Sequence, residues 1–168
     1  MTHFSHLQQK ITDRTDLVQR VRTWQQSGLN VVFTNGCFDV LHYGHLHYLA
    51  AAADLGDRLV VGLNSAESVR RLKGPTRPIH DEPTRQTTLA ALEFVDAVCV
   101  FGEDTPLELL RAVRPDFLVK GGDYVAEEVV GYAEVTGAGG AVVILPFGEG
   151  YSTTSLEQTI LVRHGIAE

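Results

Sequence analysis

The sequence predicts an α/β fold in which a five-stranded parallel sheet lies between two layers of helices. Three observations support this fold class. Short apolar runs alternate along the chain with segments of helical periodicity. The runs are nearly continuous in apolar residues, as strands buried on both faces are. Polar or glycine-containing segments follow several of the runs, where the carboxyl ends of parallel strands would meet.

Five apolar runs are the expected strands, and they stand at 30–35, 58–64, 97–101, 116–120 and 139–145. The first reads "NVVFTN" and the last reads "GGAVVIL". Because helical segments separate them, the strands are expected to run parallel, with helices on both faces. This arrangement is the Rossmann-like three-layer α/β/α fold.

The expected helices fill the intervals between these strands. Apolar residues at helical spacing predict one continuous helix over 5–27, with Ser27-Gly28 as its C-cap. Thr105-Pro106 is interpreted as an N-cap followed by proline at the first helical position. The remaining helices are expected at 44–55, 65–71, 84–95, 126–137 and from 153 onward. The chain is thus divided into a helical extension at 1–28, packed on the domain, and the domain itself at 29–168.

Charge and composition exclude several classes of function. The 168 residues carry a net charge of −7, so a general nucleic-acid-binding protein, which needs a basic face, is not expected. No apolar run reaches the roughly 18–20 residues of a membrane span, and the first residues lack the apolar core of a signal peptide. Cys37 and Cys99 have no framework spacing and are interpreted as reduced thiols. A cytoplasmic protein without membrane contact is the expectation.

The segment "TNGCFDVLHYGH" stands where the first strand passes into a helix, and it concentrates groups that suit an anion. His42 and His45 are three residues apart and share one face of the helix start. Gly44 lets a ligand approach the backbone, and the unpaired N–H groups of a helix N-terminus attract phosphate. Structural zinc on these histidines with Cys37 and Asp39 is the alternative. No second pair of ligands at suitable spacing follows, so no metal site is predicted.

Further polar segments follow the other strands. Asn64 and Lys73 come after the second strand, Lys120 begins "KGGD" at the end of the fourth, and Ser152 begins "STT" after the fifth. Lysine is scarce, since Lys10 is the only other one in the chain. Each segment also has a plainer interpretation, as a solvated lysine, a turn or an N-cap cluster. Their convergence on one edge of the sheet favours a ligand site.

Two of these segments resemble the signatures of the cytidylyltransferase-like nucleotidyltransferases. "TNGCFDVLHYGH" resembles their G-x-F-D-x-x-H-x-G-H signature, and "EGYSTTSL" resembles their second signature, a Ser-Thr-Thr run at a helix start. The segments "LNSAESVRRLKGPTRP", "ALEFVDAVCVFGEDTP", "RPDFLVKGGDY" and "EEVVGYAEV" look like the adenylyltransferase domain of bacterial ADP-heptose synthesis. The resemblance covers roughly residues 30–160.

The resemblance implies an enzyme that transfers AMP from ATP to a sugar 1-phosphate, with Mg²⁺ carried by the ATP. The implied acceptor is D-glycero-D-manno-heptose 1-phosphate, and the implied products are ADP-heptose and pyrophosphate. Because the acceptor is already an anion, the protein's task would be to position it and to stabilise charge on the phosphates.

The resemblance also implies roles for individual residues. Those implied in catalysis on the phosphates are His42, His45 and Lys73. Those implied in binding the nucleotide are Asn35, Gly36, Cys37, Phe38, Asp39, Gly44, Lys120, Gly121, Gly122, Asp123, Ser152, Thr153 and Thr154. Those implied in binding the acceptor are Asn64, Arg77 and Arg85.

Two departures from the family pattern leave the substrate open. The common Asn-Ser-Asp after the second strand reads Asn-Ser-Ala at 64–66, and the usual Glu-Gln-Arg reads Pro-Thr-Arg at 83–85. A glycerol-phosphate cytidylyltransferase or an FAD-synthetase-like adenylyltransferase is the alternative within the superfamily. A non-catalytic nucleotide-binding module is the alternative from another class. The expected partners are ATP and a sugar 1-phosphate, and the resemblance further suggests a homodimer and a separate heptose kinase.

Overall fold

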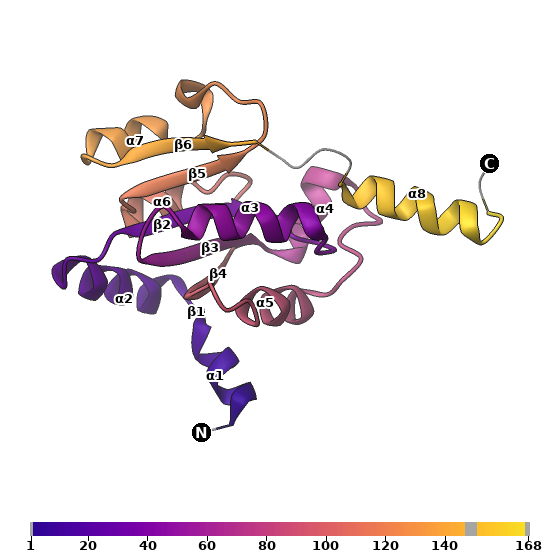
Figure 1. Cartoon of the computed structure of the whole chain (residues 1–168), viewed down its shortest axis with the longest axis horizontal. Coiled ribbons are helices and arrows are strands. Elements are labelled where there is room, and N and C mark those ends of the chain that lie inside the picture. The colour runs from indigo at the N-terminus through magenta and orange to yellow at the C-terminus, as the bar shows by residue number, and fades with distance from the viewer. Residues whose placement is uncertain (1, 147–150, 167–168) are drawn as a thin grey trace.

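The computed structural model describes residues 2–146 and 151–166, and in them a parallel sheet is covered by helices on both faces (Figure 1). The sheet has six strands in the order β1-β4-β3-β2-β5-β6, and every pairing is parallel. The predicted α/β class and Rossmann-like layering are confirmed. The strands are β1 (Ile11–Thr12), β2 (Val31–Gly36), β3 (Arg58–Asn64), β4 (Ala97–Phe101), β5 (Phe117–Gly121) and β6 (Ala141–Leu145).

The predicted strand number of five is wrong, because the short strand β1 adds a sixth. It lies inside the segment predicted as one helix and pairs in parallel with β4 at the edge of the sheet. Two separate helices, α1 (His3–Lys10) and α2 (Arg14–Gln26), flank it. Asp13 begins the second of them by accepting a hydrogen bond from the N–H of Asp16 at 2.9 Å. A β-branched pair followed by an N-capping aspartate is the local signal for this break.

The other helices lie close to most of their predicted ranges. A glycine with φ of 96°, Gly131, separates the two helical pieces of the segment predicted as a single helix over 126–137. The helix after β4 begins at Leu107, one residue later than predicted, with Pro106 as its N-cap. The helices are α3 (Tyr43–Ala53), α4 (Ala66–Lys73), α5 (Glu82–Ala90), α6 (Leu107–Val113), the 3-10 helix η1 (Ala126–Glu128), α7 (Tyr132–Gly137) and α8 (Thr153–Arg163).

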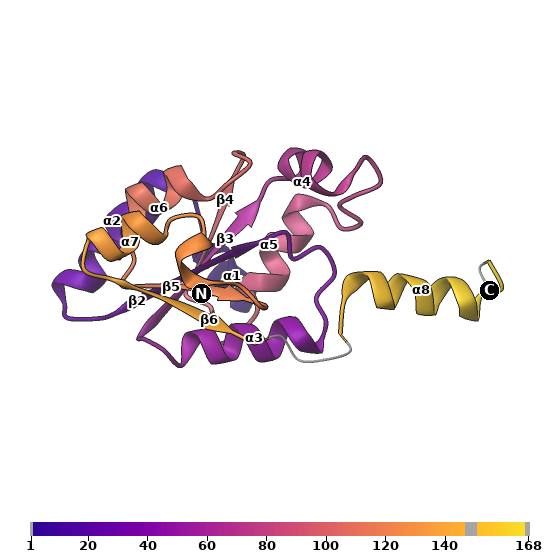
Figure 2. The same cartoon turned by 90° about the horizontal axis from the view of Figure 1, so that it is seen from above.

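Alternation along the strands divides the apolar side chains between two buried clusters. In β2, Val31 and Phe33 join the cluster formed with α2, α6 and α7. Val32 joins the cluster on the opposite face, formed with α3 and α5. Figure 2 shows these two groups of helices on either side of the sheet. The result is the three-layer core that the unbroken apolar runs predict.

The order of the strands reverses at β2. The chain passes from β2 to β3 and β4 in one direction and returns to β5 and β6 on the other side. In open α/β sheets a ligand binds at such a point, beyond the carboxyl ends of the strands. Within the described residues, no helix has both the length and the apolar character needed to cross a bilayer.

Candidate active site

A cavity of about 730 Å³ opens at the carboxyl ends of β2, β3 and β5, beside the point where the strand order reverses. Its lining comes from these strand ends and from segments far apart in the sequence, including the end of α4 and the start of α8. The predicted site residues that line it are Asn35, Gly36, Cys37, Phe38, Asp39, His45, Asn64, Lys73, Arg77, Lys120, Gly121, Thr153 and Thr154.

Some predicted residues stand behind this lining. In the part of the chain that the structure describes, those outside the cavity lining are His42, Gly44, Arg85, Gly122, Asp123 and Ser152. Two of them shape the backbone or a helix end. Gly122 has φ of 117°, a backbone conformation that residues other than glycine rarely adopt. Ser152 caps α8, because its side-chain oxygen accepts a hydrogen bond from the N–H of Ser155 at 3.0 Å.

The loop between β2 and α3 holds the two signature histidines. Phe38 in this loop has φ of 41°, a left-handed conformation that is uncommon for a bulky residue. Its buried ring stands edge-on to the imidazole of His45, with ring centroids 5.4 Å apart. His42, the N-cap of α3, stacks on His45 at 3.8 Å. Burial and, secondly, the neighbouring His42 lower the pKa of His45 to about 4, so His45 is neutral at pH 7.

The glycine between the histidines serves close packing. A Cβ on Gly44 would lie 3.1 Å from the Cβ of Tyr151 and 3.2 Å from Nδ1 of His42. The ring of Tyr151 also packs on that of Tyr43, with centroids 5.0 Å apart. The space that the missing side chain leaves is therefore filled by the residue that precedes the Ser-Thr-Thr run. Tyr151 thus brings the two signature segments into contact.

Lys73 and Lys120 supply the positive charge of the cavity. Lys73 is the last residue of α4, so it stands at a helix end rather than in a loop, and Lys120 lies in β5. Across residues 2–146 and 151–166, neither ammonium group forms a hydrogen bond or an ion pair. Burial lowers the pKa of Lys120, and nearby Lys73 lowers it further. Two unpaired cations that line one cavity, Lys120 half-buried and Lys73 exposed, favour an anionic ligand between them.

Asp39 is already held by three donors. Its carboxylate accepts hydrogen bonds from the N–H groups of Ile79 at 2.7 Å and His80 at 3.0 Å. Nη1 of Arg77 donates to it at 2.9 Å. Burial alone would raise the pKa of Asp39, but these donors outweigh it and the pKa is lowered. Arg77 also pairs through Nη2 with Glu157 of α8, so its charge is balanced by two carboxylates.

Arg85 supports the cavity from behind. It is 1% exposed, and its Nη1 donates to the carbonyl oxygens of Cys37 at 2.9 Å and Asn64 at 2.8 Å. These carbonyls belong to the segments that leave β2 and β3. Through Nη1 the guanidinium therefore ties together the two strand ends that carry the cavity, whereas its buried Nε and Nη2 have no hydrogen-bond partner among the described residues.

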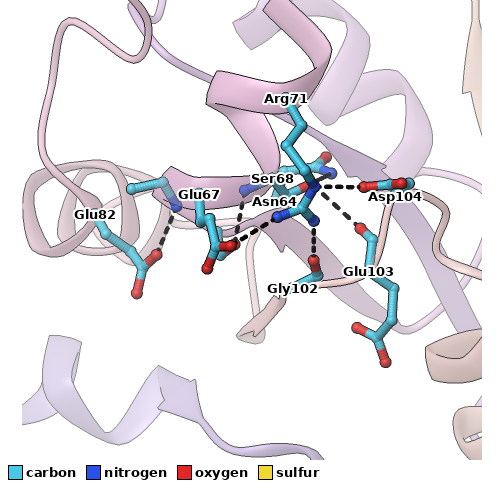
Figure 3. A network of polar contacts seen from close by, with 10 residues as sticks. Asn64, Glu67, Ser68, Arg71, Glu82, Gly102, Glu103 and Asp104 are labelled. Carbon is cyan, nitrogen blue, oxygen red and sulfur yellow. Dashed lines mark hydrogen bonds and ion pairs between the residues drawn. The ribbon is translucent and has the colours of Figure 1, made fainter. Parts of the chain in front are cut away.

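A polar network fixes α4, which carries Lys73 at its end (Figure 3). Nδ2 of Asn64 donates to Oγ of Ser68 at 3.0 Å. Arg71 donates to the carbonyl oxygen of Gly102 at 2.6 Å and to Asp104 at 2.8 Å (Figure 3). The helix is thus tied to the end of β3 and to the loop after β4.

A carboxylate stands at the N-terminus of α4 although position 66 is alanine. Glu82 of α5 accepts a hydrogen bond from the N–H of Ala66 at 2.8 Å, as Figure 3 shows on the side of the helix away from Arg71. The carboxylate complements the partial positive charge of that helix end. The family's acid is missing at position 66, but the carboxylate of Glu82 from the following helix lies at the same helix end.

One wall of the cavity is apolar, and its residues were not predicted from the sequence. It consists of Val69, Leu72, Pro106, Tyr124, Val129 and Val130. Several of these large side chains are exposed, among them Leu72 at 48% and Tyr124 at 52%. The three-residue spacing of Val69 and Leu72 on a polar helix is the one signal that could have indicated an apolar surface there. Among the described residues, no group of three or more His, Cys, Asp or Glu side chains is placed to hold a metal ion.

Known proteins resemble this chain in sequence and in structure. A sequence model of the cytidylyltransferase-like family matches residues 33–158. The chain is 53% identical over 155 residues to the bifunctional protein HldE of Trichlorobacter lovleyi, and 56% identical over 141 residues to that of a Bradyrhizobium species. These matches cover 92% and 84% of this chain but 32% and 29% of the relatives. The chain thus spans about a third of the length of the curated relatives it matches.

A solved structure shares the fold. It is described as a lipopolysaccharide core biosynthesis protein from Thermoplasma volcanium, and the TM-score is 0.60 at 32% sequence identity. The match covers 74% of this chain and 100% of that chain. The family match runs from β2 into α8 and so includes both signature segments and the strand ends that form the cavity. The chain belongs to the cytidylyltransferase-like family.

Proposed function

We propose that this chain is an adenylyltransferase that transfers AMP from ATP to D-glycero-D-manno-heptose 1-phosphate and releases pyrophosphate. The observation that carries the proposal is the pair of lysines, Lys73 and Lys120, which have no anionic partner in the described part of the chain and line one cavity with His45. A polyphosphate would stabilise both charges. Resemblance to the adenylyltransferase domain of ADP-heptose synthesis supports the acceptor, and so do the HldE relatives and the lipopolysaccharide core biosynthesis neighbour.

The proposed reaction is a single in-line displacement. An oxygen of the sugar phosphate attacks the α-phosphorus of ATP, and the bond from that phosphorus to the bridging oxygen of the β-phosphate breaks. The electron pair of this bond leaves with pyrophosphate. The attacking oxygen carries charge already, so no side chain needs to remove a proton.

The side chains act by donating to phosphate oxygens and by balancing charge. His45 is neutral at pH 7, because its pKa is about 4, and it donates a ring N–H to the transferring phosphate. Lys73 and Lys120 balance the negative charge that grows on pyrophosphate. His42 stacks on His45 and holds its ring in place.

The remaining lining residues bind the two substrates. The segment from Asn35 to Asp39 and the strand end at Lys120 and Gly121 lie against the nucleotide, and Thr153 and Thr154 at the start of α8 face its phosphates. Asn64 and Arg77 lie on the acceptor side of the cavity.

Magnesium enters as part of the substrate. A triphosphate offers hard oxygen ligands in the geometry that Mg²⁺ prefers. The carboxylate of Asp39, in the first signature, is already taken by three donors. The ion therefore arrives with ATP. A separate heptose kinase that supplies the acceptor, a homodimeric assembly and a cytoplasmic location remain predictions from the sequence.

The test is pyrophosphate release from ATP, CTP and GTP, each with heptose 1-phosphate, glycerol 3-phosphate and flavin mononucleotide as acceptors, followed by mass spectrometry of the product. We expect release with ATP and the heptose phosphate, with ADP-heptose formed. Turnover of CTP with glycerol phosphate, or of ATP with the flavin, would replace the proposal by one of the other transferases. Nucleotide binding without any release would indicate a binding module.

Substitution of the lysines separates binding from catalysis. Lys73→Met should lower kcat by about tenfold or more while the Kd for ATP changes by less, because its partner charge grows during the reaction. Lys10→Met is the matched control, since Lys10 donates to the carbonyl oxygen of Leu92 outside the cavity. Equal losses in kcat/KM and ATP affinity at unchanged kcat would show that Lys73 binds ground state and transition state alike.

A further inference from the structure

The helix α8 carries part of the cavity but has little of its own surface buried. None of its described residues is buried, and it projects from the body of the molecule in both views (Figures 1 and 2). Only its first turn reaches the cavity, through Thr153 and Thr154. A helix of this length gains its stability and its place from tertiary contacts rather than from propensity. The contacts near its start therefore decide where the two threonines lie.

One such contact is a chain of charged groups that runs from α8 to the first signature. Nη2 of Arg77 pairs with Glu157, and Nη1 pairs with Asp39 at 2.9 Å. The side chains of Arg77 and Asp39 are 16% and 8% exposed, whereas that of Glu157 is 41% exposed. A planar guanidinium suits this position, because its fork presents donors to two carboxylates at once.

The position of Glu157 along α8 links this contact to the cavity. Glu157 follows Thr153 by four residues, so the two side chains share one face of α8. The ion pair therefore turns toward the molecule the same face that presents Thr153 to the cavity. Asp39, at the other end of the chain of charges, also holds the N–H groups of Ile79 and His80.

We infer that Glu157 is a positioning residue for the nucleotide site. Acting through Arg77, it sets the start of α8 against the first signature so that Thr153 and Thr154 face the phosphates. The inference rests on the proposed function for the identity of the ligand, ATP. It gives Glu157, which does not itself line the cavity but pairs with Arg77, which does, a role that neither signature contains.

Whether removal of Glu157 weakens or strengthens ATP binding tests the inference. Glu157 is a negative charge close to a cavity that would receive a polyphosphate, so removing it should strengthen ATP binding if its influence is electrostatic alone. If it positions α8, removing it should weaken ATP binding. The two roles predict changes in opposite directions.

The experiment compares Glu157→Gln with wild type in two measurements on the whole chain. Hydrogen–deuterium exchange of the α8 amides should become several-fold faster in the variant, because the helix loses a docking contact. The Kd for ATP with magnesium, by calorimetry, should rise about three- to tenfold. Glu157→Asp, which keeps the charge, should recover part of the affinity. Glu93→Gln removes the same charge from an exposed residue just before β4, outside the cavity lining, and should change neither measurement.

Two results would overturn the inference. Unchanged exchange in α8 would show that the ion pair does not dock the helix. Faster exchange with equal or tighter ATP binding would show that docking through Glu157 does not serve the nucleotide. Neither result depends on the acceptor, so absence of pyrophosphate release in wild type would refute the proposed reaction while the exchange and affinity measurements still judge Glu157.

Discussion

The imidazole of His45 packs against the buried ring of Phe38 and the ring of His42, and this packing keeps it uncharged at pH 7. A neutral histidine is a hydrogen-bond donor through one ring nitrogen only, and its tautomer is set by its surroundings. Phe38 holds its place in a left-handed conformation, which costs free energy and is typical of functional loops. At the scale of single residues, the site is thus built on a strained loop that orients one ring.

We expect His45→Ala to lower kcat by about 10²–10³, because a donor aimed at the transferring phosphate is worth roughly 3–4 kcal/mol in the transition state. The melting temperature should change little in comparison. His47→Ala on the same helix is the control, since His47 is exposed and lies outside the cavity lining. A loss of kcat below about threefold would remove His45 from the mechanism.

The same histidine predicts how stability depends on pH. Its pKa is about 4 in the fold against an ordinary value of 6.5, so between these values the unfolded chain binds a proton that the folded chain does not. The contribution of His45 to stability is therefore complete above pH 6.5 and is lost as the pH falls toward 4. Burial lowers the pKa of His42 as well, which adds to the effect.

Thermal melts between about pH 7.5 and pH 4 should show this loss, and His45→Gln should flatten the dependence. His3→Gln, at the exposed start of the chain, should leave the slope as in wild type. A slope unaffected by His45→Gln would mean that other groups govern the acid limb.

At the scale of elements, Arg85 joins the ends of β2 and β3 from within the protein. Arg85→Met should lower the free energy of unfolding by about 3 kcal/mol, because the carbonyl groups of Cys37 and Asn64 lose a charged donor. For a chain of this size the melting temperature should fall by roughly 6–12 °C. Differential scanning calorimetry checks this, with the exposed Arg22→Met as control. A stable variant with weakened acceptor binding would instead return Arg85 to the predicted role of phosphate clamp.

The helix α4 is a second case in which an element positions a side chain. Arg71 ties it to Gly102 and Asp104, and Lys73 stands two residues further along. Arg71→Gln should lower kcat/KM about three- to tenfold with little change in melting temperature, because an exposed network orients more than it stabilises. Arg70→Gln, one residue away and exposed, should have no effect. Equal behaviour of the two variants in steady-state kinetics would show that the network is only a surface feature.

For the whole molecule, the sequence predicted the three layers of the fold and the four polar segments that follow its strands. Apolar runs and strand-end motifs are local patterns, which can be recognised without the structure. It could not predict β1, since a two-residue strand leaves almost no periodic signal and depends on pairing with β4. The apolar wall of the cavity was missed for a related reason. Val69, Leu72 and Val130 meet only after folding, and each alone is an ordinary hydrophobic residue.

The partners of the charged residues were equally hidden. Arg77 was predicted as an acceptor-binding residue, and it lines the cavity. Its two carboxylate partners come from 38 residues earlier and 80 residues later in the sequence. Such pairings carry no local signature. The role of each site residue stays a prediction until the variants above are measured.

Dependence on magnesium is a property of the whole reaction. Activity should vanish in EDTA and return with magnesium or manganese, because the ion is bound by the phosphates of ATP. The chelator should leave the melting temperature of the nucleotide-free protein unchanged. Stoichiometric zinc in the purified protein, with unfolding on chelation, would make His42 and His45 structural ligands.

The short strand β1 has a consequence for how this edge of the sheet can pair with other chains. A sheet edge offers a row of main-chain donors and acceptors to any passing strand, and long, flat edges invite intermolecular pairing. Here β1 covers Val98 and Cys99 in the middle of β4, and the edge strand itself is only two residues long, with a helix before it and a helix after it in the chain. β1 thus shortens the stretch of main chain that this edge of the sheet offers to another chain, an effect that is separate from any chemistry in the cavity.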